Sequence, residues 1–127
     1  MPVIGQFRIY REDLRSNPSV LYLFGDNDIR KGLGGQAGEM RGEPNAVGVR
    51  TKWFPDNTPS AYFNDLDFER VTNMIYDDLE RARNHLAKGG IVIIPLDGLG
   101  TGLSKLPKKA PLIARYLAQQ LAALSLD

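Results

Sequence analysis

Residues 91–107, IVIIPLDGLGTGLSKLP, contain a strand, a glycine-rich loop and the approach to a helix. The four apolar residues at the start favour β structure, and glycines follow at positions 98, 100 and 102. This order commonly binds phosphate, because glycines let backbone N–H groups approach the anion and a helix N-terminus adds a favourable dipole. The same order also occurs as a plain tight turn, so the rest of the chain has to distinguish the two interpretations.

Three further strands are expected before this stretch. Residues 20–24 (VLYLF) form a continuous apolar run that stops at a glycine, which is typical of a strand buried on both faces. Residues 3–10 and 46–50 are also expected to be strands. Residues 11–19 are expected to be a polar connection, and residues 51–64 a long loop of the kind that often carries function.

Three helices are expected between and after the strands. The clearest spans residues 65–88, where apolar side chains recur at spacings of three and four and two glycines follow. A short helix is expected over residues 36–41, and a final one from residue 108 to about residue 124. The alternation of strands and helices predicts an α/β fold: a three-layer α/β/α sandwich with a mixed, largely parallel central sheet.

The predicted architecture places a cleft at one edge of the sheet. A chain of 127 residues fits one domain, residues 1–127, with a core that needs no metal or disulfide. Ligands of such sheets bind outside the carboxyl ends of the strands. Residues 25–35 and 95–103 both leave carboxyl ends of apolar strands, so the two loops predict one cleft with two anion-binding walls. Such a cleft suits a pyrophosphate.

Charge and composition exclude several classes of function. With 16 basic and 15 acidic residues the net charge is +1, so a nucleic-acid partner would need a local basic patch. The absence of cysteine excludes disulfides, cysteine-based metal sites and a thiol nucleophile. No apolar run reaches membrane-spanning length and no signal peptide is recognisable. A cytoplasmic monomer that uses no membrane, metal or cofactor is expected.

Lys52 and the residues after the second strand are candidates for chemistry. Lys52 lies at the carboxyl end of a strand, on the edge of the two glycine loops. A lysine in a desolvated cleft acts as a nucleophile or pairs with phosphate, whereas a solvated lysine does neither. Asp26, Asn27 and Asp28 favour a turn and lack the spacing of a calcium loop. Asn27 could instead hydrogen-bond a ribose.

Other common sites do not fit the sequence. Residues 98–102 (GLGTG) are not a G-x-G-x-x-G fingerprint, and only about one helix of chain follows them. Ser104-Lys105 has the reverse of the Walker order. A dinucleotide oxidoreductase and a P-loop NTPase are therefore disfavoured. His85 is the only histidine and lies within a predicted helix, which argues against a Ser-His-Asp triad.

Three blocks of the sequence resemble the macrodomain family, small α/β/α modules that bind ADP-ribose. Asp13-Leu14, the following strand and Asn27 are similar to the early G-D-[IL] turn, strand and asparagine of that family. Residues 32–38 (GLGGQAG) resemble its ribose and phosphate loop. Residues 94–103 resemble its P-x-x-G-x-G-[IL] diphosphate loop, with about two extra residues.

The Thr51-Lys52 pair is similar to one branch of that family. This branch contains terminal ADP-ribose glycohydrolases that act on acidic side chains and antitoxin macrodomains that remove ADP-ribose from DNA bases. The resemblance implies that Lys52 is the counterpart of the lysine implicated in hydrolysis. The glycohydrolases carry an aspartate directly after G-x-G-L, where this chain has Ser104. The DNA-directed relatives lack the aspartate too, so Ser104 favours that group or binding alone.

The resemblance implies an ADP-ribosyl glycohydrolase that binds ADP-ribose and removes it from a nucleic acid or a protein. Lys52 and Asn27 are the expected catalytic residues, and Asp13 is expected to accept from the adenine amine. The aromatic residues Trp53, Phe54 and Tyr62 stack on a base or anchor the long loop in the core. A non-catalytic reader of ADP-ribose and a protein that has lost the ligand are the alternatives. The expected ligand-binding residues are Asp13, Asp26, Gly34, Gly35, Gln36, Gly98, Gly100, Thr101, Gly102, Leu103 and Ser104.

Overall fold

Four strands form one sheet in a computed structural model that describes residues 3–96, 99 and 105–125. The strand order is β1-β4-β2-β3, and every neighbouring pair in the sheet is parallel. The predicted α/β fold with a largely parallel sheet is thereby confirmed. The strands are β1 (Val3–Gln6), β2 (Val20–Asn27), β3 (Ala46–Lys52) and β4 (Ile91–Pro95).

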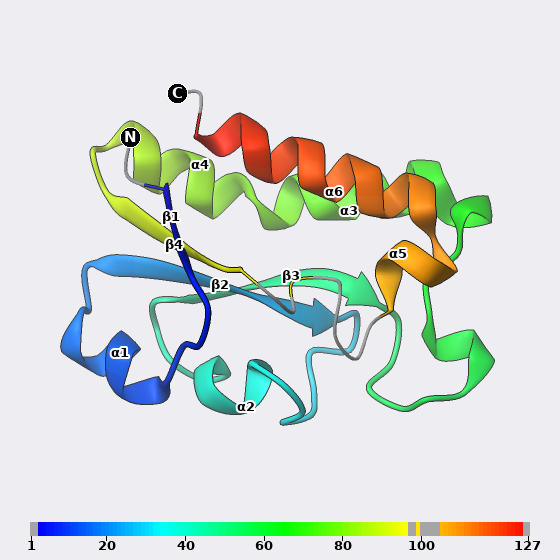
Figure 1. The fold of residues 1–127 in the computed structure, drawn as a ribbon, viewed down its shortest axis with the longest axis horizontal. Coiled ribbons are helices and arrows are strands. Elements are labelled where there is room, and N and C mark those ends of the chain that lie inside the picture. The colour runs from blue at the N-terminus through cyan, green and yellow to red at the C-terminus, as the bar shows by residue number, and fades with distance from the viewer. Residues whose placement is uncertain (1–2, 97–98, 100–104, 126–127) are drawn as a thin grey trace.

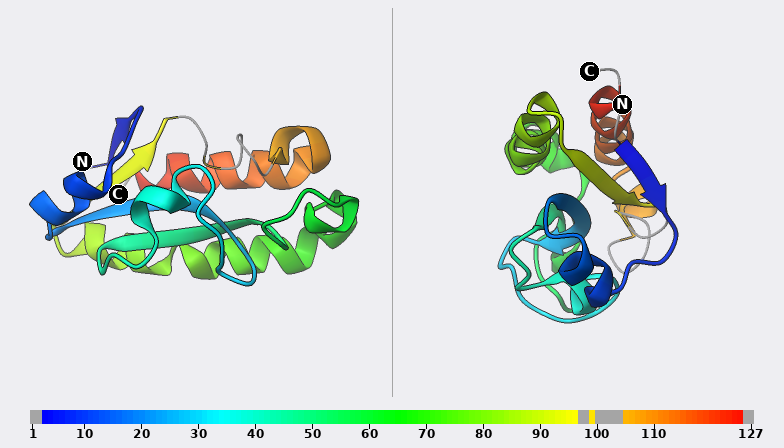
Figure 2. Two further views of the ribbon diagram at one scale, coloured as in Figure 1. Left: turned by 90° about the horizontal axis from the view of Figure 1, so that it is seen from below. Right: turned by 90° about the vertical axis from the view of Figure 1, so that its left-hand side faces the viewer.

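Helices cover both faces of this sheet (Figures 1 and 2). Helices α3, α4 and α6 lie on one face, and α1 and α2 lie on the other (Figure 1). Within the described ranges, no helix has the length and apolar character needed to cross a membrane. The helices are α1 (Arg11–Ser16), α2 (Ala37–Met40), α3 (Phe68–Asp78), α4 (Glu80–Ala87), α5 (Leu106–Lys109) and α6 (Pro111–Leu124), and the 3₁₀ turns are Pro59–Ala61 and Asp65–Asp67.

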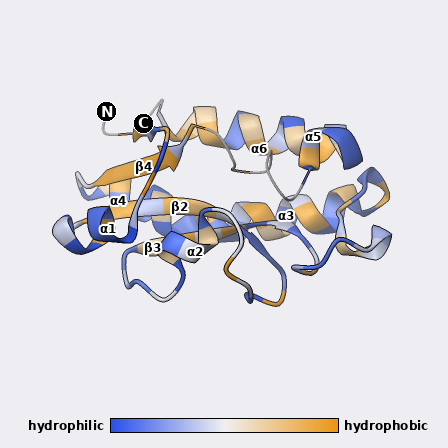
Figure 3. Ribbon diagram, turned by 60° about the horizontal axis from the view of Figure 1, so that its bottom comes forward, coloured by the Kyte–Doolittle hydropathy of each residue, from blue (hydrophilic) through white to orange (hydrophobic). Residues whose placement is uncertain are grey.

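The side chains of β2 alternate between two apolar clusters, which explains its continuous apolar sequence. Leu21 and Leu23 pack with residues of α3, α4 and α6, whereas Tyr22 and Phe24 pack with α1 and α2. All four are buried. Figure 3 shows hydrophobic residues along β2 and β4, and hydrophobic and hydrophilic residues alternating along the helices. The expected burial of this strand on both faces is confirmed.

The N-terminal predictions need two corrections. The strand predicted over residues 3–10 ends at Gln6, because its partner β4 ends at Pro95. The connection predicted over residues 11–19 contains α1. Its start is stabilised locally, since the backbone N–H of Tyr10 donates to Asp13 Oδ2 at 2.9 Å and satisfies a group that the helix leaves free.

The two long helices also differ from their predicted bounds. Residues 65–88 form a 3₁₀ turn followed by α3 and α4, which are separated only at Leu79. The helix predicted from residue 108 is divided at Ala110, which has φ −147° because the following Pro111 disfavours the helical region. The start of α6 is capped from a distance, since the Asp65 carboxylate accepts the N–H groups of Leu112 and Ile113, both at 3.1 Å.

Strands β2 and β4 separate toward their carboxyl ends. They pair only from Val20 to Tyr22 of β2, whereas β2 pairs with β3 from Tyr22 to Asn27. The chain leaves β2 toward α2 on one face and continues after β4 toward α6 on the other face (Figure 1). Ligands of parallel sheets bind at such reversals of direction. The carboxyl edge of the sheet, where β2 ends, is therefore the favoured place for a site.

Candidate functional site

A cavity of about 280 Å³ lies at the carboxyl ends of β2 and β3. A larger open groove of about 690 Å³ lies at the opposite edge and contains none of the predicted site residues. We take the smaller cavity as the candidate site, because it lies at the edge where parallel sheets bind ligands. It is lined by Gly25, Asp26, Asn27, Lys31, Gly32, Gly34, Gly35, Gln36, Ala37, Arg41, Thr51, Lys52 and Pro55.

Lys52 is the last residue of β3 and is almost fully buried at this cavity, with 6% of its surface exposed. Its Nζ donates to the carbonyl oxygen of Asp56 at 2.8 Å and lies 4.7 Å from the centroid of the Tyr62 ring. The backbones of Lys52 and Tyr62 also form an isolated antiparallel bridge. The strand end and the folded-back loop thus fix the amine from two sides.

The surroundings of Lys52 lower the pKa of its side chain. Burial lowers the pKa of its ammonium group, the carboxylate of Asp56 opposes this by raising the pKa, and the charge of Lys105 lowers it further. A lower pKa increases the fraction of free amine at a given pH. The alternative of a solvated surface lysine disagrees with this burial, whereas the roles of nucleophile and phosphate partner both stay predictions.

Asn27 lines the same cavity, and its amide closes a turn. Its Nδ2 donates to the carbonyl oxygen of Lys31 at 2.6 Å, and its Oδ1 accepts the Lys31 N–H at 3.4 Å. The turn contains Arg30 in the left-handed region, with φ +58°. Asn27 therefore orders the loop that borders the cavity. Its catalytic role stays a prediction.

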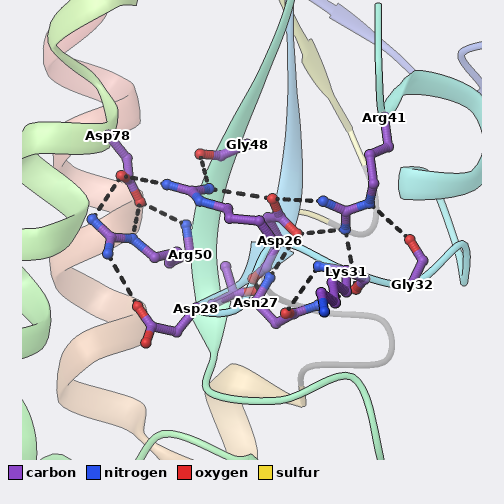
Figure 4. A network of polar contacts seen from close by, with 11 residues as sticks. Asp26, Asn27, Asp28, Lys31, Gly32, Arg41, Gly48, Arg50 and Asp78 are labelled. Atoms are coloured by element: carbon purple, nitrogen blue, oxygen red, sulfur yellow. Dashed lines mark hydrogen bonds and ion pairs between the residues drawn. The ribbon is translucent and has the colours of Figure 1, made fainter.

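Asp26 borders the cavity with a buried carboxylate that is occupied by arginines (Figure 4). Arg41 donates two hydrogen bonds to it, at 2.6 and 3.1 Å, and Arg30 donates one at 3.2 Å. The backbone N–H of Asn27 donates a further one at 2.8 Å. Asp26 thereby anchors α2 and the loop to β2, and these bonds occupy much of the acceptor capacity that a ligand would use.

The ion pairs of this region continue to α3 (Figure 4). Asp78 accepts from Arg30 at 2.9 Å and from Arg50 at 2.9 and 3.0 Å, and Arg50 also pairs with Asp28 at 3.1 Å. The carboxylates of Asp26, Asp28 and Asp78 therefore all have arginine partners. Among the described residues, no group of three or more His, Asp or Glu side chains is arranged to hold a metal ion.

The glycine-rich loop forms one wall of the cavity. Gly34, Gly35 and Gln36 line it, and Gly35 has φ +58°, which glycine adopts without strain. The Gln36 side chain bonds the backbone of Ile9 in both directions, at 2.9 and 3.1 Å. A Cβ at Gly38 would lie 2.5 Å from a carbonyl oxygen of the loop, so the loop can fold onto α2 only with glycine there.

Asp13 lies away from the other predicted residues. Its carboxylate accepts from the N–H of Tyr10 at 2.9 Å and from Gln6 Nε2 at 3.1 Å, and it does not line the cavity. The structure thus gives Asp13 a role in starting α1, and its contact with adenine stays a prediction. Outside the described residues lie Gly98, Gly100, Thr101, Gly102, Leu103 and Ser104 of the predicted diphosphate loop.

The aromatic residues of the long loop have different surroundings. Trp53 packs edge-on against Phe63 with ring centroids 4.7 Å apart, so it anchors the loop in the core. Phe54 is 43% exposed. Tyr62 is buried beside Lys52. Of the three, Phe54 has the most exposed ring for stacking.

Several residues around the cavity were not predicted from the sequence. Arg30, Lys31 and Arg41 border the loop, and Asp56 holds the Lys52 amine through its backbone. The Arg30-Lys31 pair, which follows Asp26-Asn27-Asp28 after Ile29, is the one local signal, because opposite charges in a turn favour pairing. Arg41 and Asp56 have no such signal.

The fold and this cavity define an α/β protein with a buried lysine at the carboxyl edge of a parallel sheet. The chain matches DUF7831, a family of unknown function, over residues 4–120. It therefore belongs to this family. No curated protein and no solved structure matches the chain.

Proposed function

We propose that this protein binds ADP-ribose at the carboxyl edge of its sheet and hydrolyses it from a modified macromolecule. The observation that carries the proposal is the buried amine of Lys52, which lines the cavity together with Asn27 and the loop of Gly34 and Gly35. The resemblance of residues 32–38 and 94–103 to macrodomain loops supports ADP-ribose as the ligand.

The size and shape of the site agree with one end of such a ligand. The cavity of about 280 Å³ is at the lower limit for a small-molecule site, so it would hold the distal ribose. The remaining nucleotide would extend from the cavity along the carboxyl edge of the sheet. Backbone N–H groups of the loops would then face the diphosphate.

The proposed reaction uses the free amine of Lys52. The nitrogen lone pair attacks the anomeric carbon of the ribose, while the bond to the macromolecule breaks and the leaving group takes a proton. Water then adds to the lysine–ribose intermediate and releases ADP-ribose and the amine. A protonated Lys52 would instead stabilise charge on the leaving group without a covalent bond. The lowered pKa of Lys52 favours the first route.

The test compares Lys52→Ala with Lys31→Ala, because both lysines line the cavity and only Lys52 is buried. We expect release of ADP-ribose from modified DNA and protein to fall about 100-fold or more in Lys52→Ala and by less than about threefold in the control. Calorimetric binding of free ADP-ribose should persist in both variants.

Three outcomes would contradict the proposal. Failure of the wild-type protein to bind ADP-ribose would refute the whole proposal. Binding without release from any substrate would identify a reader. Release that survives Lys52→Ala would show that another group performs the reaction.

A further inference from the structure

Three lysine ammonium groups gather around a single aromatic ring. The Nζ atoms of Lys52, Lys109 and Lys105 lie 4.7, 5.1 and 5.8 Å from the centroid of Tyr62. Lys52 ends β3, whereas Lys105 precedes α5 and Lys109 ends it. The face of the ring attracts each cation, but the three charges repel one another at this range.

Among the described residues, no carboxylate forms an ion pair with these three lysines. Every ion pair within the described residues joins a carboxylate to an arginine, and none includes a lysine. The carboxylate that acts on Lys52 belongs to Asp56, and it accepts hydrogen bonds from the N–H and hydroxyl of Thr58 at 2.9 and 2.6 Å. The cluster is thus a local positive patch on a chain whose net charge is only +1.

The patch extends from the cavity to the surface. Lys52 is buried, whereas Lys105 and Lys109 are exposed, and α5 contributes the further exposed Lys108. A single small anion could be held by the buried amine alone. A row of cations that leads outward matches a ligand with charges repeated along a chain.

We infer that Lys105 and Lys109, beside the buried Lys52, form an anion site for the phosphodiester backbone of a nucleic acid that passes the mouth of the cavity. The inference rests on the proposed function for the ADP-ribose and names nucleic acid as the macromolecule that carries it. Both ammonium and guanidinium groups bind phosphate, but the arginines near the cavity (Arg30, Arg41 and Arg50) already pair with carboxylates. In the part of the chain that the structure describes, the ion pairs use arginines, so Lys105 and Lys109 can bind an external anion.

The test measures binding of a fluorescein-labelled single-stranded 12-mer DNA by anisotropy at several salt concentrations. The variants Lys105→Gln, Lys109→Gln and Lys88→Gln each remove one exposed charge, and Lys88 follows α4 at the other end of the molecule. We expect each of the first two to weaken binding about fivefold and to reduce the salt slope by about 0.7, and Lys88→Gln to do neither.

Two kinds of result would overturn the inference. One is a failure of the expected DNA binding, seen either as equal affinity of the three variants or as no binding by the wild-type protein. The other is equally effective displacement of the DNA by a poly-glutamate peptide of the same charge, which would identify an acidic protein as the partner. Calorimetry of Lys105→Gln/Lys109→Gln with free ADP-ribose separates the two hypotheses. If the double variant binds ADP-ribose normally but no longer binds DNA, both hypotheses are supported. If the wild-type protein binds DNA but does not bind ADP-ribose, only the proposed function is refuted.

Discussion

At the scale of the residue, Lys52 is a buried cation whose charged neighbours act on it in opposite directions. Burial and Lys105 lower its pKa, while Asp56 raises it. Because the folded-state pKa is below the value in the unfolded chain, the unfolded state binds more protons between the two values. Stability from this group therefore rises with pH across that window and is lowest below the folded-state pKa.

Substitution of the two neighbours should move the pKa of Lys52 in opposite directions. Lys105→Ala removes a like charge and should raise the pKa, whereas Asp56→Asn removes an opposite charge and should lower it. The hydrogen bond from Lys52 goes to the backbone of residue 56, so the second change leaves it in place. An NMR titration of the Lys52 Cε resonance measures both shifts, and shifts of the same sign would contradict the assignment.

At the scale of the element, Asp26 joins β2 to α2 and to the loop that borders the cavity. Its carboxylate is 2% exposed, and its bonds to Arg41 and Arg30 are short and charged. Loss of one partner of a buried ion pair leaves the other charges without compensation, which costs far more than loss of an exposed pair. The wall of the cavity therefore depends on this one side chain.

Asp26→Asn should destabilise the fold by about 2 kcal/mol, measured as the free energy of unfolding in urea. The matched change Asp28→Asn removes a carboxylate that is 38% exposed and has a single arginine partner, so it should cost less than about 1 kcal/mol. Equal effects of the two changes would show that Asp26 is not the anchor of this loop.

The sequence allowed the strands and the position of Lys52 to be predicted, but not the contacts around them. Apolar runs and helical spacing are local, and they located β2, β3, β4 and the longest helical region. The Asp26–Arg41 and Arg30–Asp78 pairs join residues 15 and 48 positions apart, so no local pattern reveals them. Helix α1 was missed because its six residues are too few for a periodic pattern and its start depends on Asp13.

At the scale of the whole molecule, β3 is an edge strand whose open side is covered by side chains. Arg30 donates to the carbonyl oxygen of Gly48 at 2.7 Å, and the N–H of Arg50 donates to Asp78 at 2.9 Å. A Cβ at Gly48 would lie 2.6 Å from the carboxylate of Asp26, so a larger residue would displace that carboxylate. Free edge strands promote pairing between molecules, and the contacts of Arg30 and Asp78 oppose it.

Asp78→Ala should expose this edge and cause the protein to self-associate. The neighbouring Asp77 is exposed on the same helix, so Asp77→Ala removes the same charge without uncovering β3. Sedimentation velocity over a range of concentrations should show larger species for Asp78→Ala only. A monomeric Asp78→Ala variant with the stability of the parent would show that the arginine contacts alone protect the edge.

The strand order has a consequence for how the chain is made. Strand β4 is synthesised last of the four strands, yet it lies between β1 and β2 and is the only strand that pairs with β1 in the part of the chain that the structure describes. While residues 91–95 remain inside the ribosome, β1 lacks its partner strand and the apolar side chains of β2 lack the packing that β4 and α6 supply. The nascent protein must therefore stay open until late in translation, and long-range pairing of this kind folds slowly.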